Sequence, residues 1–326
     1  MPGLYSKPLT SRTFKMTLQL DNDIAAAFEA APPVPVPERD NPLALREITN
    51  LTLNTLFATL PPAPNVNMAT FEAVSADGTA VPLRWHTRGT ENPGSAIVYL
   101  HGGGMICGSA EVYQPLIEHF VHLTGVPFLA VDYRLAPEYT GTTPAEDAFA
   151  AIAWLFSNAD TLGVDITRIA LMGDSGGGGI GAGAAILARN KGLQLARQIL
   201  VYPMLDDRNT VPDPVLAPTA TWTYDNNYTG WHALLGDHIG TPSVSPIAAP
   251  ARLDDFTDLA PAYIEVGELD IFRDEAIDYA RRLLAAGVSC ELHIVPGAPH
   301  AHDLIGMQFP IGQRSLDEKL RAIGMV

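Results

Sequence analysis

The sequence predicts an α/β protein with a mostly parallel central sheet flanked by helices. From residue 68 onward, short apolar runs alternate with segments of helical hydrophobic spacing. Continuous apolar strands between amphipathic helices are typical of a parallel sheet that is covered on both faces. The chain has 326 residues, of which 47% are hydrophobic and 17% charged, so it is long enough and apolar enough to bury a large core.

The expected strands are short runs of apolar residues. A hairpin comes first, in TFEAVSADGTAVPLRWHT, with Asp77-Gly78 as its turn. The strands that follow are expected at 95–100, 127–133, 168–173, 198–203, 261–267 and 290–295. Between them, helical spacing predicts helices at 145–159 and 273–287.

Two segments stand apart from this alternation. Residues 1–67 hold two helical patterns, DNDIAAAFEAA and NPLALREITNLTLNTLFATL, bounded by proline-rich stretches, and we interpret them as a separate N-terminal helical segment. Residues 206–258 carry one helical pattern, GWHALLGDHI, in a stretch rich in Pro, Thr, Trp and Asn. A connection this long is usually an insertion with a function, such as a lid over a site. Residues 68–326 are therefore expected to form one catalytic domain that contains this insertion.

Composition limits the kinds of partner and metal site that are expected for this protein. Twenty Lys and Arg against 36 Asp and Glu give a net charge of −16, which repels phosphate backbones, so nucleic acid is not expected as a partner. Cys107 and Cys290 form no C-x-x-C motif and indicate neither a disulfide framework nor a zinc site. The chain shows no long apolar run and no apolar leader pattern, so we expect no membrane span and a cytoplasmic protein. The sequence leaves open whether it forms a homo-oligomer.

The stretch LMGDSGGGGIGAG, residues 171–183, places one serine in a dense run of glycines. Each glycine within a helix costs about 1 kcal/mol relative to alanine, so the run needs a reason. Gly173, Ser175 and Gly177 form G-x-S-x-G directly after the strand RIALM. At a strand-to-helix turn this pattern projects a nucleophilic hydroxyl above the sheet, and only small neighbours fit there.

A phosphate-binding loop is the alternative interpretation of the same run. Gly176, Gly178 and Gly181 match G-x-G-x-x-G, but a dinucleotide site also needs an acidic residue about 20 residues further on. The next strand ends later than that, at Asp206 and Asp207. The stretch HGGG, residues 101–104, favours the nucleophile turn over the phosphate-binding loop. It follows the strand AIVYL and leaves backbone N–H groups free to form an oxyanion hole with the residue after the serine.

A serine nucleophile needs a histidine base oriented by a carboxylate, in the chain order Ser, acid, His on this architecture. Glu268 and Asp270 follow one strand, and Asp270 is the better placed to reach a histidine. Asp274 and Glu275 begin the next helix, where acidic residues favour the helix dipole. After the last strand come His300 and His302, whereas His293 lies within that strand. We predict a triad of Ser175, Asp270 and His300.

The combined motifs resemble those of α/β-hydrolase fold esterases of the hormone-sensitive-lipase-like family. The matching stretches are HGGG (101–104), VDYRLAPE (131–138), GDSGGG (173–178), YPMLDD (202–207), ELDIFRDE (268–275) and PGAPH (296–300). This resemblance implies hydrolysis of carboxylic esters of short to medium acyl chains, with neither metal nor cofactor. It implies that the N–H groups of Gly103, Gly104 and Gly176 form the oxyanion hole, and that the base is His300.

The resemblance also implies a cap built from the N-terminal helices and the 206–258 insertion. Gly176 stands where alanine is common in the family, and His302 where an aromatic residue is typical. The resemblance gives Asp132, Arg134 and Glu138 a bracing role in the loops around the site. Candidates for the pocket wall are Trp222, Tyr224, Trp231 and Phe272. An amidase or lactonase with the same triad, or a binding protein on the same fold, stays open at this stage.

Overall fold

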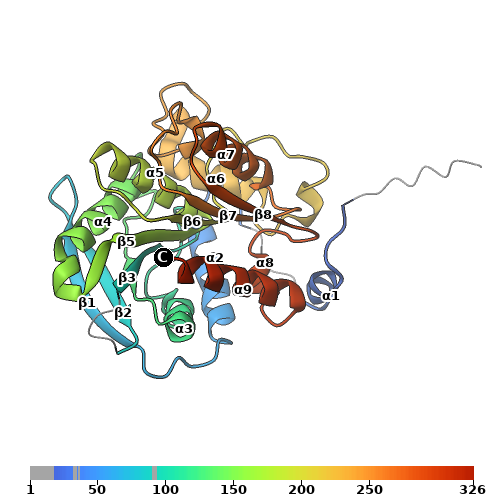
Figure 1. Ribbon diagram of the computed structural model, residues 1–326. Helices are drawn as coiled ribbons and strands as arrows, with labels where there is room; N and C mark the ends of the chain where they lie inside the picture. The colour runs from blue at the N-terminus through green and yellow to red at the C-terminus, as the bar shows by residue number, and fades with distance from the viewer. Residues whose placement is uncertain (1–17, 32–34, 36, 90–93) are drawn as a thin grey trace, which may run out of the picture.

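The computed structural model describes residues 18–31, 35, 37–89 and 94–326, and its centre is an eight-stranded sheet (Figure 1). The order across the sheet is β1-β2-β4-β3-β5-β6-β7-β8. The strands are β1 Asn67–Val74, β2 Ala80–Thr87, β3 Gly94–Leu100, β4 Phe128–Val131, β5 Val164–Asp174, β6 Gln198–Val201, β7 Ala262–Gly267 and β8 Cys290–Val295.

The sheet is mostly parallel, as predicted. The predicted hairpin is present as β1 and β2, which pair antiparallel, and β2 also pairs antiparallel with β4. All pairings from β4 through β3 and on to β8 are parallel. The carboxyl ends of β3, β5, β7 and β8 therefore meet at one edge of the sheet, and the loops that carry the predicted site residues start there.

Helices cover both faces of the sheet. One face is packed by α3 and α9, and the other by α4, α5 and α7 (Figure 1). The helices are α1 Asn22–Ala30, α2 Pro42–Phe57, α3 Gln114–Thr124, α4 Thr143–Leu162, α5 Gly176–Asn190, α6 Tyr224–Leu235, α7 Arg273–Ala285, α8 His302–Ile305 and α9 Pro310–Gly324. Every residue of β4, β6 and β7 is buried, as continuous apolar strands require.

The two predicted N-terminal helices are present. The side chain of Asp21 caps α1 by accepting the N–H of Asp23, and Asn41 caps α2 with Pro42 at its first turn. Residues 1–17 and part of the first proline-rich connector lie outside the described residues. No helix in the described part of the chain has the length and hydrophobicity that a membrane span requires.

Some elements differ from the sequence prediction. Strand β5 begins at Val164 rather than 168, because the pairing of Val164 with Gly94 extends it along β3. Helices α3, α8 and α9 were not predicted. The short α8 has too few residues for a periodic signal. The longer α9 is amphipathic and buries one face, which includes Ile311, Ala322 and Ile323.

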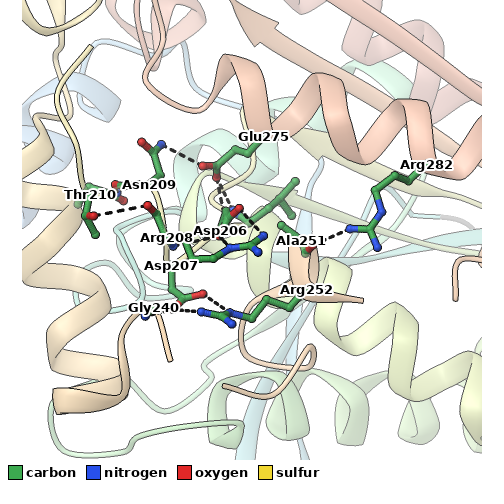
Figure 2. Close-up of polar contacts among 12 residues, drawn as sticks. Asp206, Asp207, Arg208, Asn209, Thr210, Gly240, Ala251, Arg252, Glu275 and Arg282 are labelled. Carbon is green, nitrogen blue, oxygen red and sulfur yellow. Dashed lines mark hydrogen bonds and ion pairs between the residues drawn. The ribbon is translucent and has the colours of Figure 1, made fainter. Parts of the chain in front are cut away.

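The 206–258 insertion contains no strand, and a buried ion pair joins its two ends (Figure 2). The guanidinium of Arg252 donates to both carboxylate oxygens of Asp207, over 2.5 and 2.8 Å. Asp207 is fully buried and also accepts the N–H of Gly240, at 2.7 Å. Glu275 of α7 accepts the N–H of Leu205 at 2.6 Å, which holds the start of the insertion against the helix layer.

We expect Asp207→Asn to lower the free energy of unfolding by about 3–5 kcal/mol, because it leaves the buried charge of Arg252 without its partner. Denaturant unfolding followed by circular dichroism measures this change. The matched control is Arg208→Ala, which breaks the adjacent ion pair with Asp206 (Figure 2). The Arg208 side chain is 52% exposed, so the control should shift stability by no more than about 1 kcal/mol. Equal effects of the two variants would contradict this account.

Candidate active site

Ser175 lies at a strained turn between β5 and α5, at the predicted position. Its backbone has φ 54° and ψ −119°, a conformation that a non-glycine residue rarely adopts. A Cβ atom on Gly173 would lie 2.3 Å from the carbonyl oxygen of Gly177, and one on Gly177 would lie 2.2 Å from that of Leu100. Both glycines of the G-x-S-x-G motif are therefore required by backbone contacts of the turn itself.

The rest of the glycine run lets α5 approach its neighbours closely. A Cβ atom on Gly179 would lie 2.0 Å from the carbonyl oxygen of Met204, and one on Gly183 would lie 2.2 Å from that of Ile247. A Cβ atom on Gly178 would lie 2.9 Å from Cβ of Pro203. These contacts tie α5 to the loop after β6 and to the insertion. Protein atoms fill the space next to these glycines, which argues against the phosphate-loop interpretation.

Asp270, His300 and Ser175 form one hydrogen-bonded line. Nδ1 of His300 lies 2.8 Å from Oδ2 of Asp270, and Nε2 lies 3.0 Å from Oγ of Ser175. Oδ1 of Asp270 accepts the N–H of Phe272 at 2.9 Å, which orients the carboxylate. Asp270 is fully buried, and His300 and Ser175 are 6% and 7% exposed. The line can carry a proton from the serine hydroxyl to the imidazole.

Aromatic rings and the insertion hold the imidazole in place. The rings of Tyr202 and Phe272 both meet His300 edge to face, with centroids 4.6 and 5.1 Å away. The hydroxyl of Thr221, in the insertion, donates to the carbonyl oxygen of His300 at 2.6 Å. The sequence marks Tyr202 only as the start of the YPMLDD stretch and gives no sign of the contacts that Tyr202 and Thr221 make with His300, because contacts between distant segments leave no local pattern.

The HGGG loop faces the serine turn. Gly103 and Gly104 have φ values of 124° and 57°, which favour glycine. A Cβ atom on Gly176 would lie 2.8 Å from the backbone nitrogen of Gly104, so these two backbones are in close contact. Within the described part of the chain, the N–H groups of Gly103, Gly104 and Gly176 have no protein acceptor. This arrangement leaves donors free beside the serine.

Both segments outside the alternating sheet pattern contact the loop after β3, which begins with HGGG. The indole of Trp222, in the insertion, lies against Gly104, where a Cβ atom would be 2.4 Å from its Cζ2. From α2, the guanidinium of Arg46 donates to the carbonyl oxygens of Ile106 and Ala136 and pairs with Glu138.

All four pocket-wall candidates are buried. Trp231 and Phe272 are fully buried, and Tyr224 and Trp222 are each 8% exposed. Phe272 contacts the ring of His300, as described above, and Trp222 contacts the HGGG loop.

The remaining acidic and histidine candidates have other partners. Glu268 accepts the N–H of Gly297 at 3.0 Å and supports the loop that leads to His300. His302 is fully buried at the start of α8, and its Nε2 lies 3.3 Å from Glu265. His293, on β8, pairs with Glu291 at 2.7 Å.

Two of the acidic candidates belong to α7. Asp274 pairs with Arg273 on the surface. Glu275 is buried beneath the insertion, where burial raises its pKa well above the usual value.

Asp174, next to the nucleophile, is buried beside the site. Its Oδ2 accepts the hydroxyl of Tyr99 at 2.5 Å. Burial raises the pKa of Asp174 to about 7. Burial also lowers the pKa of His101, the first residue of the HGGG stretch, to about 4, so this ring is neutral at physiological pH.

The residues with a predicted bracing role make buried or half-buried ion pairs. Arg134 binds both oxygens of the buried Asp147, at 2.7 and 2.8 Å, and also pairs with Asp77. Asp132 accepts the N–H of Ala110 at 2.7 Å. These contacts link the loops after β3 and β4 to α4 and to the hairpin.

Among the described residues, the one group of side chains that could jointly hold a metal ion is Glu291, His293 and Glu318, on β8 and α9. Arg321 already pairs with both of its glutamates. None of these side chains contacts Ser175, Asp270 or His300.

Comparison with known proteins identifies the family. The family model described as alpha/beta hydrolase fold matches residues 97–304, which include the HGGG loop, the serine turn and the loops of Asp270 and His300. The chain belongs to the alpha/beta hydrolase fold family. This confirms the fold predicted from the sequence, and the named relatives confirm the resemblance to hormone-sensitive-lipase-like esterases.

Relatives of this alpha/beta hydrolase are named as esterases. Ethyl acetate hydrolase of Pseudomonas putida is 34% identical over 240 residues, which cover 69% of this chain and 72% of the relative. The solved structure of a bacterial heroin esterase is 35% identical, with a TM-score of 0.86 over 94% of this chain and 98% of the other. Esterase LipW of Mycobacterium marinum is 30% identical, with a TM-score of 0.79 over 94% and 95% of the two chains.

We expect Gly177→Ala to lower kcat by roughly 10- to 100-fold, because the added methyl group would lie 2.2 Å from the carbonyl oxygens of Leu100 and His101 and would push the HGGG loop away from the serine turn. Ester hydrolysis assayed with p-nitrophenyl acetate measures this effect. Gly324→Ala, at a position where a Cβ atom meets nothing within 4 Å, is the control and should keep full activity. An unchanged kcat in Gly177→Ala would show that the HGGG loop does not depend on this clearance.

Proposed function

We propose that this alpha/beta hydrolase is a carboxylesterase that cleaves small-molecule esters through an acyl-enzyme intermediate. The observation that carries the proposal is the hydrogen-bonded line Asp270–His300–Ser175, which ends beside free backbone N–H groups. The relatives named as esterases support the same reaction class.

In the proposed reaction, Nε2 of His300 takes the proton of Ser175 as the serine oxygen attacks the ester carbonyl. Collapse of the tetrahedral intermediate breaks the bond to the alcohol oxygen, and the alcohol leaves with the proton that the imidazolium returns. Water then attacks the acyl-enzyme by the same steps, which releases the acid and restores the serine. Asp270 holds Nδ1–H of the imidazole and stabilises the imidazolium while it exists.

The proposed oxyanion hole consists of the N–H groups of Gly103, Gly104 and Gly176. Negative charge develops on the carbonyl oxygen only in the transition state, so donors oriented in advance lower the barrier more than they tighten substrate binding. The closeness of Gly176 to Gly104 supports a shared target for these donors.

We further propose that residues 1–67 and the 206–258 insertion form a cap over the catalytic domain, residues 68–326. Contacts of Arg46 and Trp222 with the HGGG loop support this division. The hydrogen bond between Asp40 N–H and Thr229 Oγ1, at 2.9 Å, links the two parts of the cap. A cytoplasmic location is proposed because both cysteines are free, as in a reducing compartment.

Ser175→Ala should lower kcat for p-nitrophenyl acetate by roughly 10⁴- to 10⁶-fold, because it removes the nucleophile. Unlike the wild type, the variant should also resist covalent labelling by a fluorophosphonate probe, as read by mass spectrometry. Normal turnover in Ser175→Ala would overturn the proposed mechanism. If the wild type instead hydrolyses amides faster than matched esters, the fold and triad stand but the enzyme is an amidase.

The two histidines after β8 should behave differently. His300→Ala should lower kcat by about 10³-fold or more, because it removes the proposed base. His302→Phe should keep kcat within roughly tenfold, although it removes a partner of the buried Glu265 and should lower the melting temperature. The opposite ranking of kcat would make His302 the base. Thermal unfolding of both variants separates loss of catalysis from loss of fold.

A further inference from the structure

A chain of buried polar side chains connects the C-terminal helix to the imidazole of His300. Lys319 of α9 is 3% exposed, and its ammonium donates to Oδ2 of Asp303 in α8. The other oxygen of Asp303, Oδ1, accepts the hydroxyl of Tyr202 at 2.9 Å. The ring of Tyr202 meets His300 edge to face, with centroids 4.6 Å apart and planes at 66°.

The Asp303–Lys319 pair remains ionised despite its burial. Burial by itself would raise the pKa of Asp303, but the charge of Lys319 brings it below its usual value. Burial by itself would lower the pKa of Lys319, but Asp303 and Glu265 raise it. A buried ion pair of this kind often stabilises less than apolar packing would, so its presence next to the site calls for a role other than stability.

Tyr202 is held in an unusual conformation at the end of β6. Its φ of 36° lies in the region that favours glycine, and its N–H donates to the carbonyl oxygen of Glu265 at 2.6 Å. The backbone and the hydroxyl are thus both anchored, and the ring between them has little freedom.

His300 needs such a support. Its two nitrogens are aligned by Asp270 and Ser175, but a ring held only through its edge atoms can still swing about its side-chain torsions. Phe272 limits this movement from one side, and Tyr202 contacts the ring as well. A displacement of about 1 Å at a reacting atom can cost roughly 100-fold in rate.

We propose that Tyr202, anchored through Asp303 to Lys319, is a positioning residue that keeps Nε2 of His300 within hydrogen-bonding distance of Ser175. The inference rests on the proposed esterase function and adds to it a dependence of catalysis on α9. None of these three residues is proposed to contact substrate. Substitutions at them should therefore change kcat and leave substrate binding unchanged.

The first test uses Tyr202→Phe, which keeps the ring but removes the hydroxyl that binds Asp303. We expect kcat for p-nitrophenyl acetate to fall about tenfold while KM stays within twofold. Lys319→Met should give a similar or larger loss of kcat, because Asp303 then lacks its counter-charge. In the double variant Lys319→Met/Asp303→Asn the uncompensated charge is gone and the amide oxygen still accepts from Tyr202. This double variant should recover most of the kcat that Lys319→Met loses.

The matched control is Ser315→Ala, one helical turn before Lys319 on the same buried face of α9. Ser315 donates to Glu265 and does not contact Tyr202 or Asp303, so this variant loses a buried hydrogen bond of its own. It should lower the melting temperature and leave kcat unchanged. Losses of kcat that merely follow the melting temperature across all variants, the control included, would overturn the positioning role.

The outcomes separate this inference from the proposed function. A wild type without esterase activity refutes the function. An active wild type with an inactive Ser175→Ala, but with unchanged kcat in Tyr202→Phe and Lys319→Met, supports the function and refutes the positioning role. A rise in KM without a fall in kcat also refutes it, because Tyr202 would then act on substrate binding.

Discussion

The strained backbone of Ser175 is the constraint on which the rest of the site depends. A positive φ at this residue turns the chain from the end of β5 directly into α5 and leaves the hydroxyl at the sheet edge. The turn brings backbone atoms so close that Gly173 and Gly177 can carry no side chain. Such strain persists only where surrounding packing determines it, and the glycines of α5 supply that packing by close contact with the loop after β6 and with the insertion.

The parallel sheet then supplies the other groups of the site. Because β3, β5, β7 and β8 end at the same edge, the HGGG loop, the serine turn and the loops of Asp270 and His300 meet although they are far apart in the sequence. The strands β4, β6 and β7 are buried along their whole length. The insertion and helix α2 contact the loop after β3 from outside the sheet, through Trp222 and Arg46.

Charge is buried around this site to a degree that composition did not suggest. Asp174 beside the nucleophile and the pair of Asp303 with Lys319 lie within the protein, and each has a hydrogen-bonding partner. The Asp207–Arg252 pair is a further buried ion pair, within the insertion. The Asp303–Lys319 and Asp207–Arg252 pairs connect α8 to α9 and the two ends of the insertion, segments that the sheet does not join.

The sequence by itself determined the fold class, the positions of most strands and the residues from which the proposed triad is drawn. The spacing of apolar residues and the placement of glycines are local properties of the sequence. The serine turn and the HGGG loop could therefore be recognised without the tertiary structure. Asp270, which the sequence favours over Glu268, is hydrogen-bonded to His300. Only the tertiary structure decided which groups support the imidazole. Thr221, Tyr202 and Lys319 lie about 80, 100 and 20 residues from His300. Tyr202 begins the YPMLDD stretch, but the stretch itself does not show that its ring meets His300. Their roles follow from packing between distant segments, which depends on the three-dimensional course of the whole chain.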